Sequence, residues 1–472
     1  MMAARLIGTI SFVLIVIACS ANAHAFGQKH DLAMPLAFYL AGAGFAVALS
    51  FLASFLFMRL SIGQRLYLDI LVPKHGIKIF RNLMCTLSLA IFILIFATGL
   101  IGPETSTENF ATVFVWIIWW VGMVLFTALV VDIWTIASPF KIIIDVALRV
   151  WGRSRNQRVP ISFGWLSVVG LISISWIELI SSWSEYPRTL VLLIAVYTFS
   201  LFLGSFIVGR QNWFNAVDPI TWLFDLLGHM APIVIGKNKI RLRVPASGLA
   251  ELSLTGAKAV FMVTLIAVVL FDGLSETPVW TAILQWVEQS QSLRPTLIRL
   301  QSIGIDLLVM LRGMALLTTI LAAVVFYALL SILIWITSGR TQPLLLIFTT
   351  FSSSLMPIAV AYHFAHYISY IALAGQLVIP ISSDPFGMGW DIFGGAGRII
   401  NAGIITARGV WWTNAIVLVI GHALSVLVAH TLALRLFANI HKAVLSQIPM
   451  MVFMVGLTSF SLWILAQPVV NQ

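Results

Sequence analysis

Four of the ionisable side chains within the long apolar stretches of this 472-residue chain are the residues best suited to chemistry. His363 and His366 are three residues apart, so on a helix both imidazoles lie on one face. His422 lies near the middle of another apolar stretch, and Asp272 closes a third. An ionisable side chain inside a membrane normally faces a cavity, a partner or a metal ion. Imidazole and carboxylate suit zinc, copper or another divalent transition metal, so we predict a metal site formed by these histidines beside Asp272.

Two further carboxylates, Asp384 and Asp391, follow the apolar stretch that carries the histidine pair. They lie in a segment rich in glycine and aromatic residues, Asp384-Pro385-Phe386-Gly387 followed by Gly389-Trp390-Asp391. Surface loops often carry functional residues, so we expect this segment to form a lid over the site. A metal-bound water can lose its proton near neutral pH and attack an ester, with a carboxylate as general base. Asp272, Asp384 and Asp391 are therefore the candidate catalytic residues.

The same residues have two other interpretations. The histidines can form hydrogen bonds between helices and hold the bundle together. Alternatively, a transporter or metal-handling permease uses the three histidines and Asp272 to bind a copper ion or a proton in transit. His430 lies eight residues beyond His422, about 12 Å further along a helix, and is a poorer candidate for the same site.

The N-terminus has the features of a cleavable export signal, residues 1–23. Arg5 precedes the apolar run 6–18, and Ala21-Asn22-Ala23 is a small-x-small site of the kind that signal peptidase cuts. Two alternatives stay open: a lipobox in which Cys19 is lipidated, and an uncut membrane anchor.

Cleavage after residue 23 would make His24 the first mature residue. Its amine and imidazole can then chelate copper, with His30 six residues on. An exposed terminal segment that contains two histidines is the simpler interpretation, so neither residue is assigned to the main site.

Composition places the chain in a membrane. Sixty per cent of its residues are hydrophobic and only 9% are charged, more apolar side chains than a soluble core can bury. We therefore predict an all-α fold, a polytopic transmembrane bundle in which residues 24–472 form a single domain. Apolar runs long enough to cross about 30 Å of hydrocarbon lie near 35–58, 83–101, 111–136, 162–180, 188–208, 253–273, 308–336, 345–376, 411–436 and 446–467.

The placement of charge predicts the orientation of these spans. A net charge of +10 would suggest nucleic acid as a partner of a soluble protein. Here the basic residues gather in alternate loops, as the positive-inside rule requires, so we predict a lipid bilayer and no nucleic acid as partner. We expect the bacterial inner membrane, with both mature ends in the periplasm. The loops assigned to the cytoplasm carry Arg59, Arg65, Lys74, Lys78, Arg81, Lys141, Arg149, Arg153, Arg155, Arg158, Lys237, Lys239, Arg241, Arg243, Arg340, Arg435 and Lys442.

Two short cytoplasmic helices are expected near 139–150 and 219–230. Ser138-Pro139-Phe140 and Asp218-Pro219-Ile220 are eighty residues apart, and each places an N-cap residue before a proline at the first helical turn. A recurrent helix start at a membrane surface explains this similarity, and a duplicated hairpin is the alternative.

The chain resembles a family of bacterial membrane-bound organophosphate hydrolases, the fenitrothion hydrolases. The likeness is best from about 260 to 435, and His366 matches the pattern of the family better than His363. It implies hydrolysis of lipophilic phosphotriesters with release of a nitrophenol, a small lipophilic substrate, and a second membrane subunit as partner. The residues that carry it are Phe271-Asp272-Gly273-Leu274-Ser275, the segment 357–367, Asp384-Pro385-Phe386-Gly387, Gly389-Trp390-Asp391, Gly421-His422 and Ala429-His430, with a weaker match at Ala23-His24-Ala25-Phe26.

Overall fold

The chain folds into a bundle of membrane-spanning helices. A computed structural model describes residues 31–56, 67–151 and 159–468, and the predicted signal sequence, with His24 and His30, lies outside these residues. Ten helical segments within the described residues are long and apolar enough to cross a membrane, so the predicted all-α, multi-pass fold is confirmed. They are Leu36–Phe55, Lys74–Ile101, Phe110–Leu129, Ser162–Leu179, Pro187–Val208, Gly256–Ser275, Leu307–Thr337, Leu344–Ser383, Ala407–Leu436 and Ile440–Ala466.

Most of these spans are continuous helices. Most of their side chains are apolar, as expected when one side meets lipid and the other meets protein. The continuous helices are α2 (Leu36–Leu56), α3 (Lys74–Ile101), α8 (Trp165–Leu179), α9 (Pro187–Val208), α12 (Gly256–Ser275), α15 (Leu307–Thr337), α19 (Ala407–Leu436) and α20 (Ile440–Ala466).

The third and eighth spans are built from several pieces. The third consists of α4 (Phe110–Val113), the π-helix η1 (Phe114–Met123) and α5 (Val124–Leu129). The eighth consists of α16 (Leu344–Ser352), η5 (Ser353–Leu355), α17 (Met356–Leu373), η6 (Ala374–Leu377) and α18 (Val378–Ser383). The break at η5 precedes Pro357, which has no N–H for the helix ladder, while Ser352 and Ser354 turn their hydroxyls to the carbonyls of Thr349 and Phe351.

Four predicted span boundaries were wrong by six residues or more. The second span begins at Lys74 and not at 83, and the tenth begins at Ile440 and not at 446. The ends of two further spans also differ. The third span was expected to reach residue 136 but ends at Leu129. The carboxylate of Asp132 accepts a hydrogen bond from the N–H of Thr135 at 3.0 Å, which starts the separate helix α6 (Trp134–Ala137). The eighth span was expected to end at residue 376 but continues through η6 and α18 to Ser383.

The two short helices predicted from the repeated proline motif are present. They are α7 (Pro139–Val150) and α11 (Pro219–Gly228), which follows α10 (Arg210–Val217). The Asp218 carboxylate caps α11 by accepting the N–H groups of Ile220 at 3.1 Å and Thr221 at 3.2 Å, whereas the Ser138 side chain makes no capping bond. The expected cap is therefore confirmed for α11 alone. Because α11 is almost entirely buried against α5 and α8, it is part of the bundle interior.

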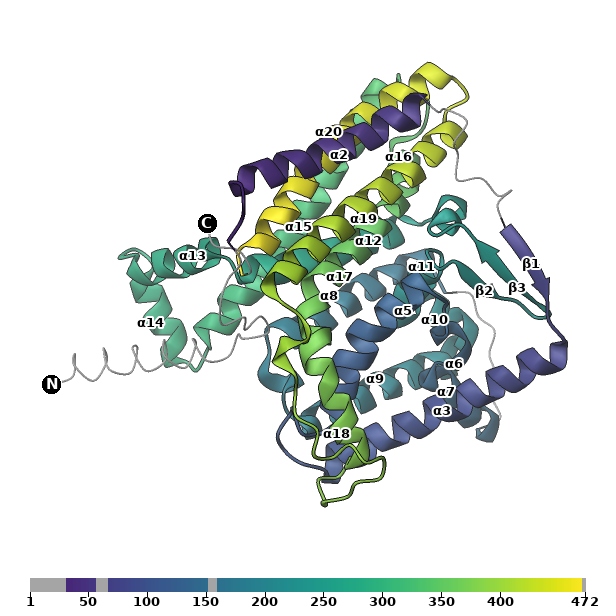
Figure 1. Ribbon diagram of the computed structural model, residues 1–472, viewed down its shortest axis with the longest axis vertical. Helices are drawn as coiled ribbons and strands as arrows, with labels where there is room; N and C mark the ends of the chain where they lie inside the picture. Colours follow the sequence, from purple (N-terminus) through teal and green to yellow (C-terminus); the bar gives the residue numbers. More distant parts are fainter. Residues whose placement is uncertain (1–30, 57–66, 152–158, 469–472) are drawn as a thin grey trace.

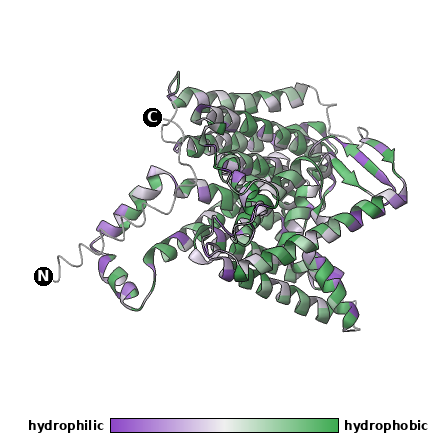
Figure 2. Ribbon diagram, turned by 60° about the horizontal axis from the view of Figure 1, so that its bottom comes forward, coloured by the Kyte–Doolittle hydropathy of each residue, from purple (hydrophilic) through white to green (hydrophobic). Residues whose placement is uncertain are grey.

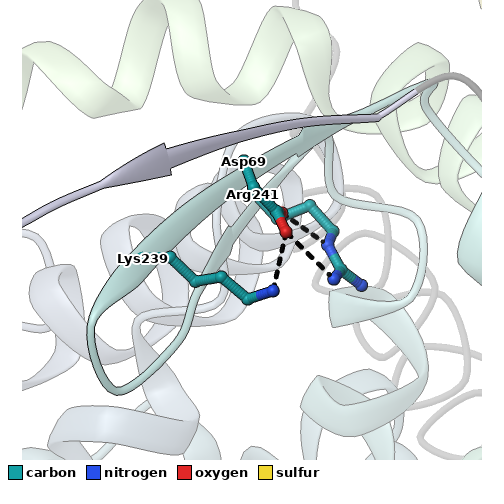
Figure 3. Close-up of polar contacts among 3 residues, drawn as sticks. All are labelled: Asp69, Lys239 and Arg241. Carbon is teal, nitrogen blue, oxygen red and sulfur yellow. Dashed lines mark hydrogen bonds and ion pairs between the residues drawn. The ribbon is translucent and has the colours of Figure 1, made fainter.

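A small antiparallel sheet was not expected. Its strands are β1 (Tyr67–Leu71), β3 (Lys239–Arg243) and β2 (Ile233–Ile235), in that order across the sheet. Asp69 pairs in register with Arg241, and Figure 3 shows its carboxylate between Lys239 and Arg241. The sheet thus ties the segment after the first span to the segment before the sixth, two loops that were both assigned to the cytoplasm.

The sheet and a helical hairpin lie at opposite ends of the bundle. Figure 1 shows the sheet at one end, while α13 (Pro278–Gln289) and α14 (Arg294–Ser302) project from the other. Apolar residues cover the long helices, while polar residues are more frequent on the hairpin and, within the sheet, on strand β3 (Figure 2). The remaining short turns are η2 (Ile161–Gly164), η3 (Ser182–Ser184), η4 (Ser247–Glu251) and η7 (Ala402–Ile404).

Candidate functional site

Asp272, His366 and Tyr367 form a buried polar cluster between two spans. Asp272 lies near the end of α12, and the other two are neighbours on α17. The same carboxylate oxygen of Asp272, Oδ2, lies 2.7 Å from His366 Nε2 and accepts a hydrogen bond from the Tyr367 hydroxyl at 2.8 Å. The side chains of His366 and Asp272 are only 4% and 17% exposed. Two of the residues singled out in the sequence, Asp272 and His366, are thus in direct contact.

Glycines allow the helices around this cluster to approach closely. A Cβ atom on Gly273, next to Asp272, would lie 2.6 Å from the Tyr362 hydroxyl and 2.7 Å from Ile464 Cγ2. A Cβ atom on Gly421 of α19 would lie 2.3 Å from the Ala361 Cβ. All three distances are shorter than real side chains permit, so these two glycines set the separation of α12, α17, α19 and α20.

Glu178 extends the cluster and was missed by the sequence interpretation. It lies at the end of α8, and its Oε1 is 3.5 Å from the Tyr367 hydroxyl. Glu178 also interacts with the side chain of Trp120 on η1. The signal was available, because Glu178 is a carboxylate within the predicted span 162–180, and Tyr367 directly follows His366 in the sequence.

A small cavity of about 60 Å³ adjoins the cluster. Its polar lining residues include Glu178, Asp272, His363 and Tyr367, and the rest of its wall is mostly apolar. One buried water needs roughly 10–15 Å³ of such space, so the cavity has room for a few water molecules and for no large ligand.

His363 and His422 are both buried but take different positions. His363 lines the cavity, and its ring centroid is 4.8 Å from that of Tyr367. His422 does not line it, and its Nδ1 is 2.8 Å from the Leu418 carbonyl oxygen, one turn earlier on α19. Nε2 of each ring is buried and has no hydrogen-bond partner among the described residues. The structure thus brings His363 to the Asp272 cluster and leaves His422 apart from it.

Asp384 and Asp391 lie in a loop that is organised by its own hydrogen bonds. Asp384 accepts the N–H groups of Met388 and Gly389 at 2.9 and 2.7 Å, and Asp391 accepts that of Ala396 at 2.9 Å. Neither residue lines the cavity beside Asp272. The helical chain continues from His366 through α18, which carries this loop roughly 25 Å further along the helix direction.

The described residues do not fit the predicted metal site. Among them, no group of three or more His, Cys, Asp or Glu side chains is placed to hold a metal ion. The geometry gives the reason, because His366 Nε2 is engaged with the Asp272 carboxylate and His422 does not line the cavity beside Asp272. The predicted zinc or copper ion therefore has no set of ligands among the residues that the structure describes.

A second buried polar cluster stabilises α11. Asp218 accepts hydrogen bonds from the hydroxyls of Tyr197 and Thr221 as well as from backbone N–H groups. Burial raises the pKa of Asp218 even though these hydrogen bonds oppose the shift. Burial likewise lowers the pKa of Lys141, against the attraction of the carboxylates of Asp218 and Asp132. This cluster contains a helix cap and has a structural role.

Comparisons of the chain with protein-family models, with curated proteins and with solved structures find no match. The resemblance to fenitrothion hydrolases therefore stays an expectation from the sequence. The function has to be argued from the buried cluster and the cavities around it.

Proposed function

We propose that this protein is a membrane-embedded hydrolase of lipophilic phosphotriesters. The observation that carries the proposal is the Asp272 carboxylate, held by His366 and Tyr367 at the wall of a cavity that has room for water. A carboxylate in that setting can act as a general base toward a bound water. We place the protein in a bacterial inner membrane with both mature ends in the periplasm. Ten spans among the described residues support one part of this, because an even number puts residues 31 and 468 on the same side of the membrane.

The proposed reaction needs one base and one water. Asp272 takes a proton from a water in the cavity, and the water oxygen forms a bond to phosphorus. The bond from phosphorus to the aryl oxygen breaks, and the aryl oxide leaves with the bonding electrons and receives the proton that Asp272 took, which returns Asp272 to its carboxylate form. His366 and Tyr367 act as positioning residues, because they fix the carboxylate through hydrogen bonds at 2.7 and 2.8 Å. No step uses a metal ion, since the described residues provide no fitting ligand set.

The substrate class rests on the resemblance and on physical chemistry. Neutral triesters of the fenitrothion type partition into lipid, so an enzyme within the membrane meets them where they are concentrated. The cluster lies within apolar spans, where such a substrate arrives without crossing water.

The proposal is tested by His366→Ala, with His430→Ala as the matched control. Both residues are buried histidines with a side-chain partner, but His430 pairs with Gln447 at 3.0 Å, away from the cavity. Nitrophenol release by purified protein in lipid vesicles should fall about 100-fold or more in His366→Ala, because the base is no longer held. The control should keep its activity. Normal activity in a well-inserted His366→Ala protein would contradict the assignment.

A metal-handling or proton-coupled permease is the second candidate. It is favoured by His422 and His430, which lie eight residues apart on α19, are fully buried and each keep one unpartnered ring nitrogen among the described residues. A permease needs such groups along a path through the membrane. Copper or proton uptake into vesicles that depends on His430, without ester turnover, would favour this function over hydrolysis.

Metal analysis separates the predicted metal site from the observed hydrogen-bonded cluster. Purified wild-type protein is compared with the His363→Ala, His366→Ala double variant. The geometry of the cluster predicts equal zinc and copper content in both. A stoichiometric metal ion that is lost only in the double variant would restore the three-histidine prediction and replace the metal-free mechanism.

A further inference from the structure

A second, much larger cavity lies on the other side of α8. Its volume is about 660 Å³, and it is enclosed mainly by α3, η1, α8 and α9. Its wall is almost entirely apolar and rich in aromatic rings, including Trp116, Trp119 and Trp134. Several lining side chains are also exposed on the outer surface of the bundle, among them Leu166 and Val196. The cavity therefore opens toward the lipid.

Trp120 lies at the boundary of the two cavities. Of the described residues, it alone lines both. Along α8, Ile174 and Ile177 line the large cavity while their neighbours Ser175 and Glu178 line the small one, so this helix forms the rest of the partition. Trp120 belongs to the π-helix η1, a rare conformation that recurs at functional sites. It also interacts with Glu178 in the polar cluster.

The two cavities differ in what they can hold. The small one accommodates a few waters, far less than the roughly 300–1,000 Å³ typical of sites for drug-sized ligands. The large one falls within that range at about 660 Å³. An aryl phosphotriester can therefore be bound only in the larger of these two cavities. The indole rings of its wall suit the stacking of an aryl group.

We propose that the large cavity is the binding site for a neutral, lipophilic aryl ester that enters from the membrane. Trp120 is the gate between this ligand and the water beside Asp272. The inference rests on the proposed hydrolase function and supplies its substrate site. For reaction, the Trp120 side chain must swing aside so that the ester group meets the small cavity, while the aryl body stays among the tryptophans.

Photolabelling tests the site without relying on catalysis. The probe is an aryl phosphotriester that carries a diazirine on its ring. On irradiation it loses N₂, and the carbene inserts into a nearby bond of the protein in lipid vesicles. Mass spectrometry should find attachment concentrated on peptides from α3, η1, α8 and α9, and an excess of unlabelled triester should remove at least nine-tenths of it. Labelling of lipid-exposed α15 should be weak and insensitive to the competitor.

Two variants on one helix sharpen the test. Ser173 and Val169 are both exposed residues of α8, but only Ser173 lines the cavity. Ser173→Phe should reduce the competed labelling several-fold and raise KM for the triester, whereas Val169→Phe should change neither. In Trp120→Ala, the partition is lost, so label should also reach the α17 peptide that contains His363 and Tyr367.

The outcomes are distinct. Labelling that no triester displaces, or that is spread equally over α15, would overturn the inference. Displacement by added phospholipid as effective as by triester would assign the cavity to a lipid acyl chain and would also overturn it. If the triester displaces the label and His366→Ala still hydrolyses it at the full rate, the binding site stands and the proposed catalytic cluster is rejected. If hydrolysis requires His366 but the cavity is not labelled, the catalytic cluster stands and the binding site is rejected.

Discussion

Asp272 and Asp69 are two carboxylates that differ in the charge of their partners and in their burial. Asp69, on the sheet at one end of the bundle, is paired with two full positive charges, Lys239 Nζ at 2.6 Å and Arg241 Nε at 2.9 Å. Asp272 lies within one of the membrane spans, and its carboxylate contacts an imidazole at 2.7 Å and a phenol hydroxyl at 2.8 Å. Both contact close partners, but only Asp69 is paired with side chains that carry a fixed positive charge.

The difference follows from the two environments. The Asp69 side chain is 28% exposed and its cationic partners are 38% and 39% exposed, so water screens all three charges. Asp272 and His366 are more deeply buried, where a fixed charge is costly and a partner that can give or take a proton is favoured. The first arrangement stabilises a loop pairing, and the second is suited to proton transfer.

The largest effect is expected from removing the charge of Asp272. Asp272→Asn keeps the shape of the side chain and an oxygen acceptor but cannot take up a proton, so hydrolysis should fall by about 10²- to 10⁴-fold. Asp384→Asn is the matched control, because that carboxylate bonds only to the N–H groups of its own loop in the contacts given above. Turnover of a nitrophenyl triester by both purified variants is the measurement. Equal losses in the two would restore Asp384 to the site as a lid residue.

An intermediate effect is expected from Tyr367→Phe. The change removes the Tyr367 hydroxyl as a donor to Asp272 and leaves the bond to His366, so activity should fall about tenfold, in line with about 1.4 kcal/mol of lost hydrogen bonding. Tyr362→Phe is the control one residue before the histidine pair, since the buried Tyr362 hydroxyl has no partner among the described residues. It should leave kcat and KM unchanged. A larger loss in Tyr362→Phe than in Tyr367→Phe would show that the cluster has been assigned to the wrong tyrosine.

The spans were predictable because lipid imposes a simple requirement on long stretches of sequence. The ten apolar runs correspond to ten helical spans among the described residues, and even the short helix α11 was marked by Asp218 before Pro219. The errors arose where a few local hydrogen bonds decide the outcome, as at Asp132. The sheet was not predicted, although the sequence of one strand contains a pattern that indicates it. The alternation Lys239-Ile240-Arg241-Leu242-Arg243 is typical of a strand, but its basic residues were interpreted only as a sign of orientation.

The site was predictable in part. The cost of burying charge indicates which residues in a span have a special role, but it does not indicate which of them contact one another. Asp272 and His366 were both identified, and they are in contact. His422 was grouped with them on depth alone, and depth says nothing about which way a ring points. Glu178 was overlooked although the same cost applies to it. The two cavities depend on the packing of four or more helices, which no local pattern in the sequence reveals.

The smallest effect is expected at Asp69, and it should depend on pH and salt in a way that Asp272 does not. Hydrogen bonds from Arg241 and Lys239 lower the pKa of Asp69 from its ordinary 3.8 to about 2. Because the pKa is lowered in the folded state, the pairing stabilises that state above about pH 4, and the stabilisation is lost as pH falls toward 2. Asp69→Asn should therefore unfold at a slightly lower temperature than wild type near neutral pH, with the difference shrinking in acid.

High salt sharpens the contrast between the two carboxylates. At about 1 M salt the screening length is about 3 Å, so the penalty of Asp69→Asn should nearly vanish, whereas the loss of hydrolysis in Asp272→Asn should persist. Thermal unfolding of detergent-solubilised protein, with Glu288→Gln on α13 as an exposed control, measures the first, and triester turnover measures the second. A salt-insensitive penalty at Asp69 would mean that the sheet is held by packing rather than by charge, since a pair this exposed cannot escape screening by any other route.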